Sequence, residues 1–166
     1  VGLGVPKVGI AISREAETKE FLEEIVPAAV KKAKDAGATS IFCFGWQLLK
    51  LEKDMPTRQK LDAICSDIPI YFADDEGHKG LANTILLVKS GIMSEDGKVL
   101  KKEIRGGEIV MGADGTPTGF LKEQAGTYTR SFLDSDRLFP VDVAKETLVD
   151  IQQKLLSEGY TMYMDG

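Results

Sequence analysis

Apolar residues recur every three or four positions between Thr18 and Ala36, which is the spacing of one face of an α-helix. Pro27 interrupts this run, so it marks either a kink or the first turn of a second helix. Gly37 follows the run and is a typical helix stop. The apolar face of the predicted helix comprises Phe21, Leu22, Ile25, Val26, Ala29, Val30 and Ala33.

Short apolar runs predict buried β-strands elsewhere in the chain. The polar segment Asp74–His78 is predicted to be the loop at the end of one of them. Ala113–Thr116 reads Ala-Asp-Gly-Thr between two short apolar runs, which predicts a tight β-hairpin turn. The predicted strands are Lys7–Ile12, Ser40–Phe44, Ile68–Ala73 and Tyr160–Met164.

Four further helices are predicted between these strands. Thr57 is a suitable N-cap for the first of them, and Gly91 ends the second. On the last helix, Ala144, Leu148, Ile151 and Leu155 form one face. The expected boundaries are Thr57 to about Ala63, Lys79 to Ser90, about Leu121 to Phe132, and Pro140 to Gly159.

A helix followed by a glycine and a strand occurs twice, as Lys31–Phe44 and Ile151–Met164, which is typical of α/β organisation. No linker or low-complexity segment divides the chain, so residues 1–166 are predicted to form a single α/β domain. We expect a mixed α/β layer rather than a closed barrel. Strands without partners would leave an exposed sheet edge, which would allow a homodimer.

Composition narrows the classes of partner. The 166 residues are 43% hydrophobic and 28% charged, which is ordinary for a globular protein. The net charge is −5 and no basic stripe occurs beside aromatic residues, so we expect no nucleic-acid partner. No apolar run approaches the roughly 20 residues of a membrane span, so we expect no membrane partner. Cys43 and Cys65 lack Cys-x-x-Cys spacing and are expected to be reduced and buried.

The segment Gly106–Ala125 contains Gly-Gly, Asp-Gly, Thr-Gly and Leu-x-Glu-x-Ala in that order. This run resembles the signature of the family 3 amidohydrolases, in their YtcJ-like branch. The resemblance extends from about Gly37 to Asp165, and it implies a metal-dependent hydrolase built on a (β/α)8 barrel. Its other pieces are Gly45-Trp46, Pro56-Thr57-Arg58, Leu61-Asp62, Pro69-Ile70-Tyr71, Asp75-Glu76-Gly77-His78, Asn83 and Gly159-Tyr160-Thr161 to Asp165.

The number of histidines limits what this chain can do alone. The family carries a His-x-His motif and further histidines because neutral imidazole is a principal ligand for zinc-like ions. This chain has one histidine, His78, and an eight-fold barrel takes about 250 residues, so we expect an internal piece of a larger catalytic domain with an inserted β-hairpin region. The expected cofactor of the parent enzyme is a divalent metal, with zinc as the expected ion, whereas the isolated piece is expected to bind none.

Four residues are candidates for the site. His78 follows a predicted strand in an acidic loop, where an imidazole can orient a substrate carbonyl or move a proton; otherwise it caps the next helix. The resemblance favours the catalytic role. It also implies that Glu123 supplies a metal-bridging carboxylate in the parent, the alternative being a solvent-facing side chain in the first turn of a helix.

Trp46 and Asp75 are the candidates for substrate binding. The indole of Trp46 would form a pocket wall, or it would simply pack under a loop. The family's Asp-Gly-His motif has one residue more here, so either Asp75 or Glu76 matches its Asp.

The resemblance therefore predicts part of an enzyme in which a metal-activated water hydrolyses an amide or another C–N bond of a small-molecule substrate. The alternative is a self-contained small α/β binding or regulatory module without catalysis.

Overall fold

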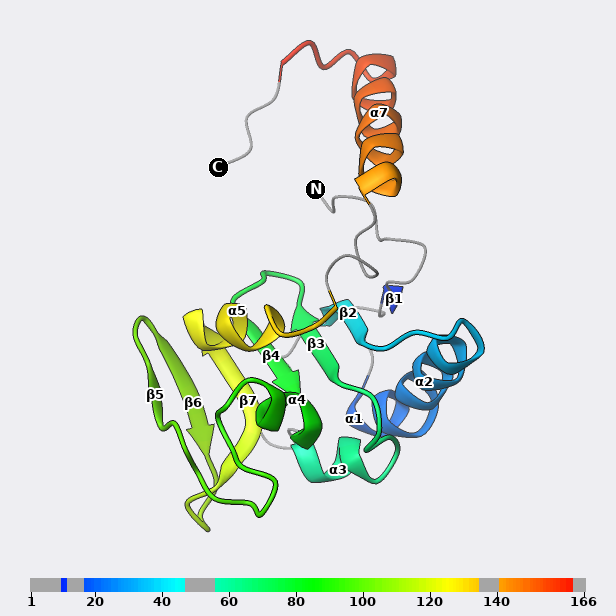
Figure 1. The fold of residues 1–166 in the computed structure, drawn as a ribbon. Coiled ribbons are helices and arrows are strands. Elements are labelled where there is room, and N and C mark those ends of the chain that lie inside the picture. The colour runs from blue at the N-terminus through cyan, green and yellow to red at the C-terminus, as the bar shows by residue number, and fades with distance from the viewer. Residues whose placement is uncertain (1–9, 12–16, 47–55, 135–140, 163–166) are drawn as a thin grey trace.

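The computed structural model describes residues 10–11, 17–46, 56–134 and 141–162. Seven strands form one open sheet in the order β1-β2-β3-β4-β7-β6-β5 (Figure 1). The pairs β1–β2 and β2–β3 are parallel, and the remaining four pairs are antiparallel. The strands are β1 (Ile10–Ala11), β2 (Ile41–Trp46), β3 (Ile70–Asp74), β4 (Lys79–Ala82), β5 (Glu103–Ile104), β6 (Gly107–Met111) and β7 (Pro117–Glu123).

Helices cover both faces of this sheet. In Figure 1, the blue helices α1 and α2 lie on one side of the central strands, and the yellow helix α5 lies on the other. Helix α7 stands apart from the sheet in the same view. The helices are α1 (Thr18–Glu20), η1 (Phe21–Ile25, π-helical), α2 (Val26–Asp35), α3 (Arg58–Asp62), α4 (Thr84–Lys89), α5 (Gln124–Arg130) and α7 (Val141–Ser157).

The alternation of side chains along β3 divides the core into two clusters. Ile70 and Phe72 face the cluster that contains residues of η1, α2 and α3. Tyr71 and Ala73 face the cluster that contains residues of α4 and α5. All five residues of β3 are buried, since a strand covered on both faces has no solvent side.

The expected mixed α/β layer is confirmed as an open mixed sheet with helices on both faces. The run from Thr18 is helical as far as Asp35, and Gly37 ends it at φ +65°. Pro27 lies in the first turn of α2, where its missing N–H breaks no bond within that helix. The predicted hairpin is also confirmed, because β6 and β7 pair antiparallel on either side of residues 113–116.

Three predicted boundaries are wrong. Lys79–Ala82 is a strand rather than the first turn of a helix, because it pairs with both β3 and β7. Leu121–Glu123 continues β7, so the helix there begins only at Gln124. Tyr160–Met162 is not a strand, and the rest of that prediction lies outside the described residues. The first two errors have the same cause, since pairing between distant segments overrides local propensity. Residues 160–162 have no strand partner in the described sheet.

The two edges of the sheet are short strands of two residues each, β1 and β5. Exposed charged residues Lys102, Glu103 and Arg105 lie in and beside β5, and charge on an edge disfavours further strand pairing. The homodimer through a sheet edge stays a prediction. Among the described residues, none of the helices combines the length and apolar character needed to cross a bilayer.

Candidate functional site at the carboxyl ends of the strands

The predicted site residues lie at or beside the carboxyl ends of three central strands of the sheet. Strands β2 and β3 are parallel, and β7 runs the same way as β3 because each is antiparallel to β4. The carboxyl ends of β2, β3 and β7 are Trp46, Asp74 and Glu123, and β4 begins beside them at Lys79. In α/β sheets, ligands bind at the carboxyl ends of the parallel strands.

The loop that carries His78 is held by Asp74. This carboxylate is 5% exposed, and its Oδ1 accepts a 3.0 Å hydrogen bond from the backbone N–H of Lys79. The Asp74 carbonyl accepts from the N–H of Gly77 at 3.4 Å, and Gly77 has a φ of +79° that favours glycine. The loop is therefore closed on itself, and it presents His78 at the rim of the sheet.

Glu123 ends β7 in an unusual backbone conformation. Its φ of 51° and ψ of −128° make it the only non-glycine residue with positive φ in the described part of the chain. Such a conformation costs about 1–3 kcal/mol and persists only where the surroundings impose it. Here the Glu123 N–H donates a 2.6 Å hydrogen bond to the carbonyl of His78.

A bare glycine on the neighbouring strand allows this sharp turn. Gly107 pairs with Glu123, and a Cβ atom at Gly107 would overlap the backbone nitrogen of Ala125. The chain passes directly from β7 into α5 at this point, so Glu123 forms an elbow between strand and helix. Backbone strain of this kind clusters at active sites, ligand clamps and switch regions.

The side chains of His78 and Glu123 form a pair. Nδ1 of His78 lies 3.0 Å from Oε2 of Glu123, and the side chains are 60% and 57% exposed. The hydrogen bond to Glu123, and then its negative charge, raise the pKa of His78, and Asp74 and Glu76 add to this effect. A carboxylate on Nδ1 keeps the proton of a neutral imidazole on that nitrogen, which leaves Nε2 as the basic nitrogen.

The structure bears on the alternative roles of these two residues, a helix cap for His78 and a first-turn helix position for Glu123. His78 does not cap a helix, because the segment after it is β4. Glu123 precedes α5 as its N-cap and makes no side-chain cap hydrogen bond there. The structure thus brings together the two residues predicted to carry the chemistry, while their roles stay predictions.

Trp46 lies in the core rather than beside the His78 ring. Its side chain is 0% exposed and stacks on Phe21 at 3.7 Å between ring centroids, with 14° between the planes. The cause is an irregularity in β2 at Gly45, where φ is +102° and the register with β3 shifts. This shift turns Trp46 onto the buried face that Cys43 also occupies. Its role as a pocket wall stays a prediction.

Asp75 is partly exposed at the start of the loop, where its N–H donates to the carbonyl of Trp46 at 3.1 Å. It therefore joins the ends of β2 and β3. Its role in substrate binding also stays a prediction.

Two structural contributors to the site escaped the sequence analysis. Asp74 was predicted only as part of the polar loop, but it is the buried last residue of β3 and it shapes the loop. Its signal was available, because an Asp at a strand end before a glycine-containing loop often binds backbone N–H groups. Tyr71 on β3 gave no such signal, since its contacts with β4 and α5 arise only on folding.

The described residues do not form a complete metal site. Within them, no group of three or more His, Cys, Asp and Glu side chains is arranged to hold a metal ion. His78 and Glu123 together supply an imidazole and a carboxylate, which is fewer than the three protein ligands usual at a catalytic zinc. Cys43 and Cys65 are both buried in the core, as expected.

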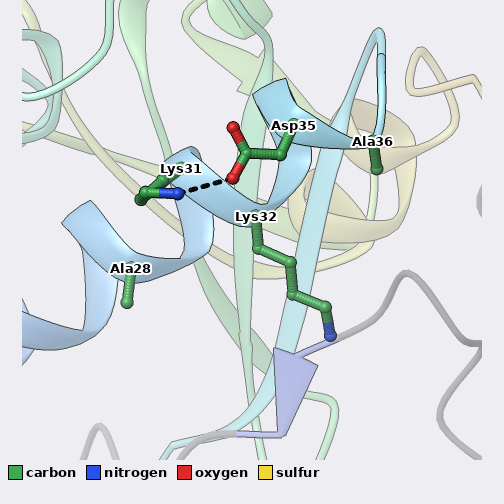
Figure 2. Close-up of a pocket in the computed structure, with 5 residues that line it drawn as sticks. All are labelled: Ala28, Lys31, Lys32, Asp35 and Ala36. Carbon is green, nitrogen blue, oxygen red and sulfur yellow. Dashed lines mark hydrogen bonds and ion pairs between the residues drawn. The ribbon is translucent and has the colours of Figure 1, made fainter.

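A shallow hollow of about 480 Å³ lies along α2 (Figure 2), and neither His78 nor Glu123 is among its lining residues. Lys31 in this hollow is paired with Asp35 at 2.6 Å, on the adjacent helical turn. The residues that line the hollow all belong to α2 or to its C-cap: Ala28, Lys31, Lys32, Asp35 and Ala36. We assign it no function.

A sheet covered by helices on both faces, with an imidazole and a carboxylate at the carboxyl ends of its strands, is the layout of an α/β enzyme or ligand-binding domain. The sequence identifies the family more closely. Residues 7–166 match the amidohydrolase family, and the chain belongs to it.

Individual relatives are much longer than this chain. Protein LONG AFTER FAR-RED 3 of Arabidopsis thaliana is 27% identical over 164 residues, which are 99% of this chain and 26% of that protein. Crystal structures of uncharacterized metal-dependent hydrolases from Pyrococcus horikoshii OT3 and Pyrococcus furiosus are both 22% identical, with TM-scores of 0.44 and 0.43. Each alignment covers 92% of this chain, and it covers 25% of the P. horikoshii chain and 26% of the P. furiosus chain. The chain thus spans about a quarter of each of these proteins.

Proposed function

We propose that this chain is part of the catalytic domain of a metal-dependent amidohydrolase that cleaves amide or other C–N bonds of a small-molecule substrate. Family membership over residues 7–166 supports the class of enzyme. The observation that carries the proposal is the contact between His78 and Glu123 at the carboxyl ends of the strands. In this proposal the sheet is a section of a (β/α)8 barrel, and the β6–β7 hairpin belongs to an inserted region.

The two residues have separate proposed roles. Glu123 contributes a carboxylate to the metal site of the complete domain, where the metal, when bound, supplies a water that is nucleophilic near neutral pH. His78 contacts the substrate or the developing charge through Nε2, because its Nδ1 faces Glu123. Trp46 and Asp75 are proposed to support the substrate side, with Asp75 nearer the surface. The remaining metal ligands lie outside the described residues.

The proposal is tested on the product of the complete coding region that contains residues 1–166. Purified protein is analysed for metal content and then incubated with a panel of N-acyl and N-formyl amides, with the released amine as the readout. We expect about stoichiometric divalent metal and release of amine from at least part of the panel. A metal-loaded protein that releases no amine from any of them would favour the binding module without catalysis.

Two substitutions separate the proposed roles. Glu123→Gln is expected to reduce both metal content and turnover, because an amide is a weaker metal ligand than a carboxylate. His78→Asn keeps a donor near the position of Nδ1 but has no equivalent of Nε2, so we expect normal metal content and about 10²–10⁴-fold slower turnover.

Glu108→Gln is the matched control, because Glu108 pairs with Lys122 at 2.9 Å and is not a site residue. If the Glu123 and His78 variants both keep wild-type turnover and metal content, the site assignment is wrong.

The 166-residue chain alone is a second test of the metal assignment. With one imidazole and no complete ligand group among the described residues, we expect the isolated chain to lose zinc on dialysis and to show no hydrolysis. Stoichiometric zinc that survives dialysis would mean that this chain holds the metal by itself.

A further inference from the structure

The hydroxyl group of Tyr71 lies between two backbone segments that approach each other unusually closely. Tyr71 is in the middle of β3, and its side chain is 3% exposed on the face that α4 and α5 cover. A Cβ atom at Gly80 on β4 would overlap the hydroxyl oxygen, and so would a Cβ atom at Gly126 on α5. The end of the phenol ring therefore fills the space that side chains at both glycines would need.

These two glycines flank the site. Gly80 comes two residues after His78, and Gly126 comes three residues after Glu123. Gly80 is also fixed within the sheet, where it pairs with Ala73 of β3 and Leu121 of β7. The Tyr71 hydroxyl thus separates the strand that follows His78 from the helix that follows Glu123.

The surroundings of this hydroxyl keep it neutral. Burial raises the pKa of Tyr71 well above its ordinary value, and the negative charge of Asp74 adds to the increase, whereas Arg130 opposes it. A phenol with such a raised pKa stays protonated near neutral pH. Its contribution to the site is therefore its size and position.

We propose that Tyr71 is a positioning residue, whose hydroxyl sets the distance between β4 and α5 and thereby the contact between His78 and Glu123. The proposal rests on the proposed function only in taking that pair as the site. It also explains why glycine is required both at position 80 and at position 126.

The geometry offers a compensating pair of substitutions. Without the hydroxyl, the nearest atom to a Cβ at position 126 is ring carbon Cζ at 3.6 Å, an ordinary contact distance. Ala at position 126 therefore suits Phe at position 71, and its methyl group refills the space of the lost hydroxyl. Position 80 offers no such compensation, because a Cβ there lies 2.7 Å from Cε1 of the ring, which Phe retains.

The readout is the tautomer of His78, the only histidine in the chain, from imidazole ¹⁵N chemical shifts at one fixed pH of about 9, where the ring is mostly neutral. In the wild type we expect the proton on Nδ1, facing Glu123. Gly126→Ala is expected to move the His78 population toward the Nε2–H tautomer, because the added methyl group displaces the Tyr71 hydroxyl. Tyr71→Phe is expected to move the population part of the way in the same direction.

The double variant Tyr71→Phe/Gly126→Ala is expected to restore the wild-type tautomer. Tyr71→Phe/Gly80→Ala is expected not to restore it. Amide hydrogen exchange gives a second local readout, since the Glu123 N–H is bonded to the His78 carbonyl. In Tyr71→Phe this amide should exchange about threefold to tenfold faster than in the wild type, while the Gly112 amide in the hairpin turn is unchanged.

Tyr128→Phe is the matched control on the same helix. This substitution removes a partly buried hydroxyl that donates to the Ser90 carbonyl at 2.9 Å, so it should lower stability without changing the His78 tautomer.

The proposal is overturned if Tyr71→Phe leaves the tautomer and the Glu123 exchange rate at wild-type values, or if the Gly126→Ala double variant fails to restore them. Both comparisons hold even if Gly126→Ala alone does not fold. Either result leaves the hydrolase proposal intact, whereas a wild-type His78 that lacks the Nδ1–H tautomer would contradict the site itself.

Discussion

Glu123 and His78 are joined twice, once through the backbone and once through their side chains. The N–H of Glu123 donates to the His78 carbonyl at 2.6 Å, and Oε2 of Glu123 lies 3.0 Å from Nδ1 of His78. The two residues are far apart in the sequence, so only the pairing of β4 with β7 brings them together. This double connection makes the pair the most testable feature of the site.

The first prediction concerns the titration of His78. Because the hydrogen bond and charge of Glu123 raise the His78 pKa, Glu123→Gln should lower that pKa toward the ordinary imidazole value. A ¹H–¹³C NMR titration of the single histidine measures it directly. Glu108 lies on the neighbouring strand β6 and pairs with Lys122, so Glu108→Gln should leave the titration of His78 unchanged. An equal pKa in wild type and Glu123→Gln would show that the pair does not form in solution.

The same shift has a consequence for stability against pH. A pKa that is raised in the folded state stabilises that state fully below the unfolded imidazole value, and the contribution disappears as pH rises through the raised value. The stability difference between wild type and Glu123→Gln should therefore be largest at mildly acidic pH and decrease above neutrality. Urea unfolding at several pH values checks this, and a difference that grows with pH would contradict it.

The second prediction concerns the strained backbone of Glu123. Replacing it with glycine removes a penalty of about 1–3 kcal/mol and adds about 0.5–1 kcal/mol of unfolded-state entropy, so Glu123→Gly should unfold at higher urea concentration. The His78 pKa should decrease in the same variant. Glu108→Gly, at an exposed strand position without positive φ, should instead destabilise. If both variants destabilise equally, the elbow is not strained.

The third prediction concerns Asn83, which is 0% exposed and joins several loops. Its Oδ1 accepts from the N–H groups of Ile70 and Leu86 at 3.0 and 3.3 Å, and its Nδ2 donates to the carbonyls of Cys65 and Ile68 at 3.3 and 2.8 Å. Asn83→Ala should cost about 3 kcal/mol, because buried backbone groups lose their partners.

Asn83→Asp adds a pH signature to this prediction. The substitution places a carboxylate against two carbonyl oxygens, so the folded-state pKa of this carboxyl should be raised. The free energy of unfolding of the variant should therefore fall further below that of the wild type as the pH rises from 4 to 7. Ser131→Ala, on an exposed helix end, is the control and should change stability little. Urea unfolding measures all three variants, and a change of less than about 1 kcal/mol for Asn83→Ala would contradict the network.

The fourth prediction concerns Arg58, which attaches α3 to α4 and to the start of β7 beside the hairpin turn. Its guanidinium donates to the Pro117 carbonyl at 2.7 Å and to the Thr84 hydroxyl at 2.8 Å. A lysine ammonium cannot reproduce this fork, so Arg58→Lys should lose about 1–2 kcal/mol of stability and speed amide exchange in the turn. Arg105→Lys is the exposed control, and equal effects of the two changes would mean that the fork contributes nothing.

Much of the fold was predictable because its signals are local. The period of Phe21, Val26 and Val30 predicted the first helix, and Gly37 and Gly91 ended helices as expected. Ala113–Thr116 predicted the hairpin, because tight-turn residues act within a few positions of the chain. The motifs also marked His78 and Glu123 as site candidates, and the structure brings their side chains into contact.

The boundaries that failed depend on contacts between distant residues. The apolar Leu81 made Lys79–Ala82 look like the start of a helix. The segment becomes β4 because it forms backbone hydrogen bonds with β3 on one side and β7 on the other. The burial of Trp46 depends on the shift at Gly45, and the role of Asp74 depends on the loop that it closes. None of these relations has a fixed spacing in the sequence.

The sequence by itself determined the mixed α/β class, the family, and the identity of the one imidazole and of the carboxylate that meets it. Local propensity and motif order are properties of the chain, so they are readable from it. Only the tertiary structure decided that His78 contacts Glu123, that Glu123 adopts positive φ, and that the Tyr71 hydroxyl lies between β4, which follows His78, and α5, which follows Glu123. Those features arise from close packing of β3, β4, β7 and α5, which exists only when all four elements are in place.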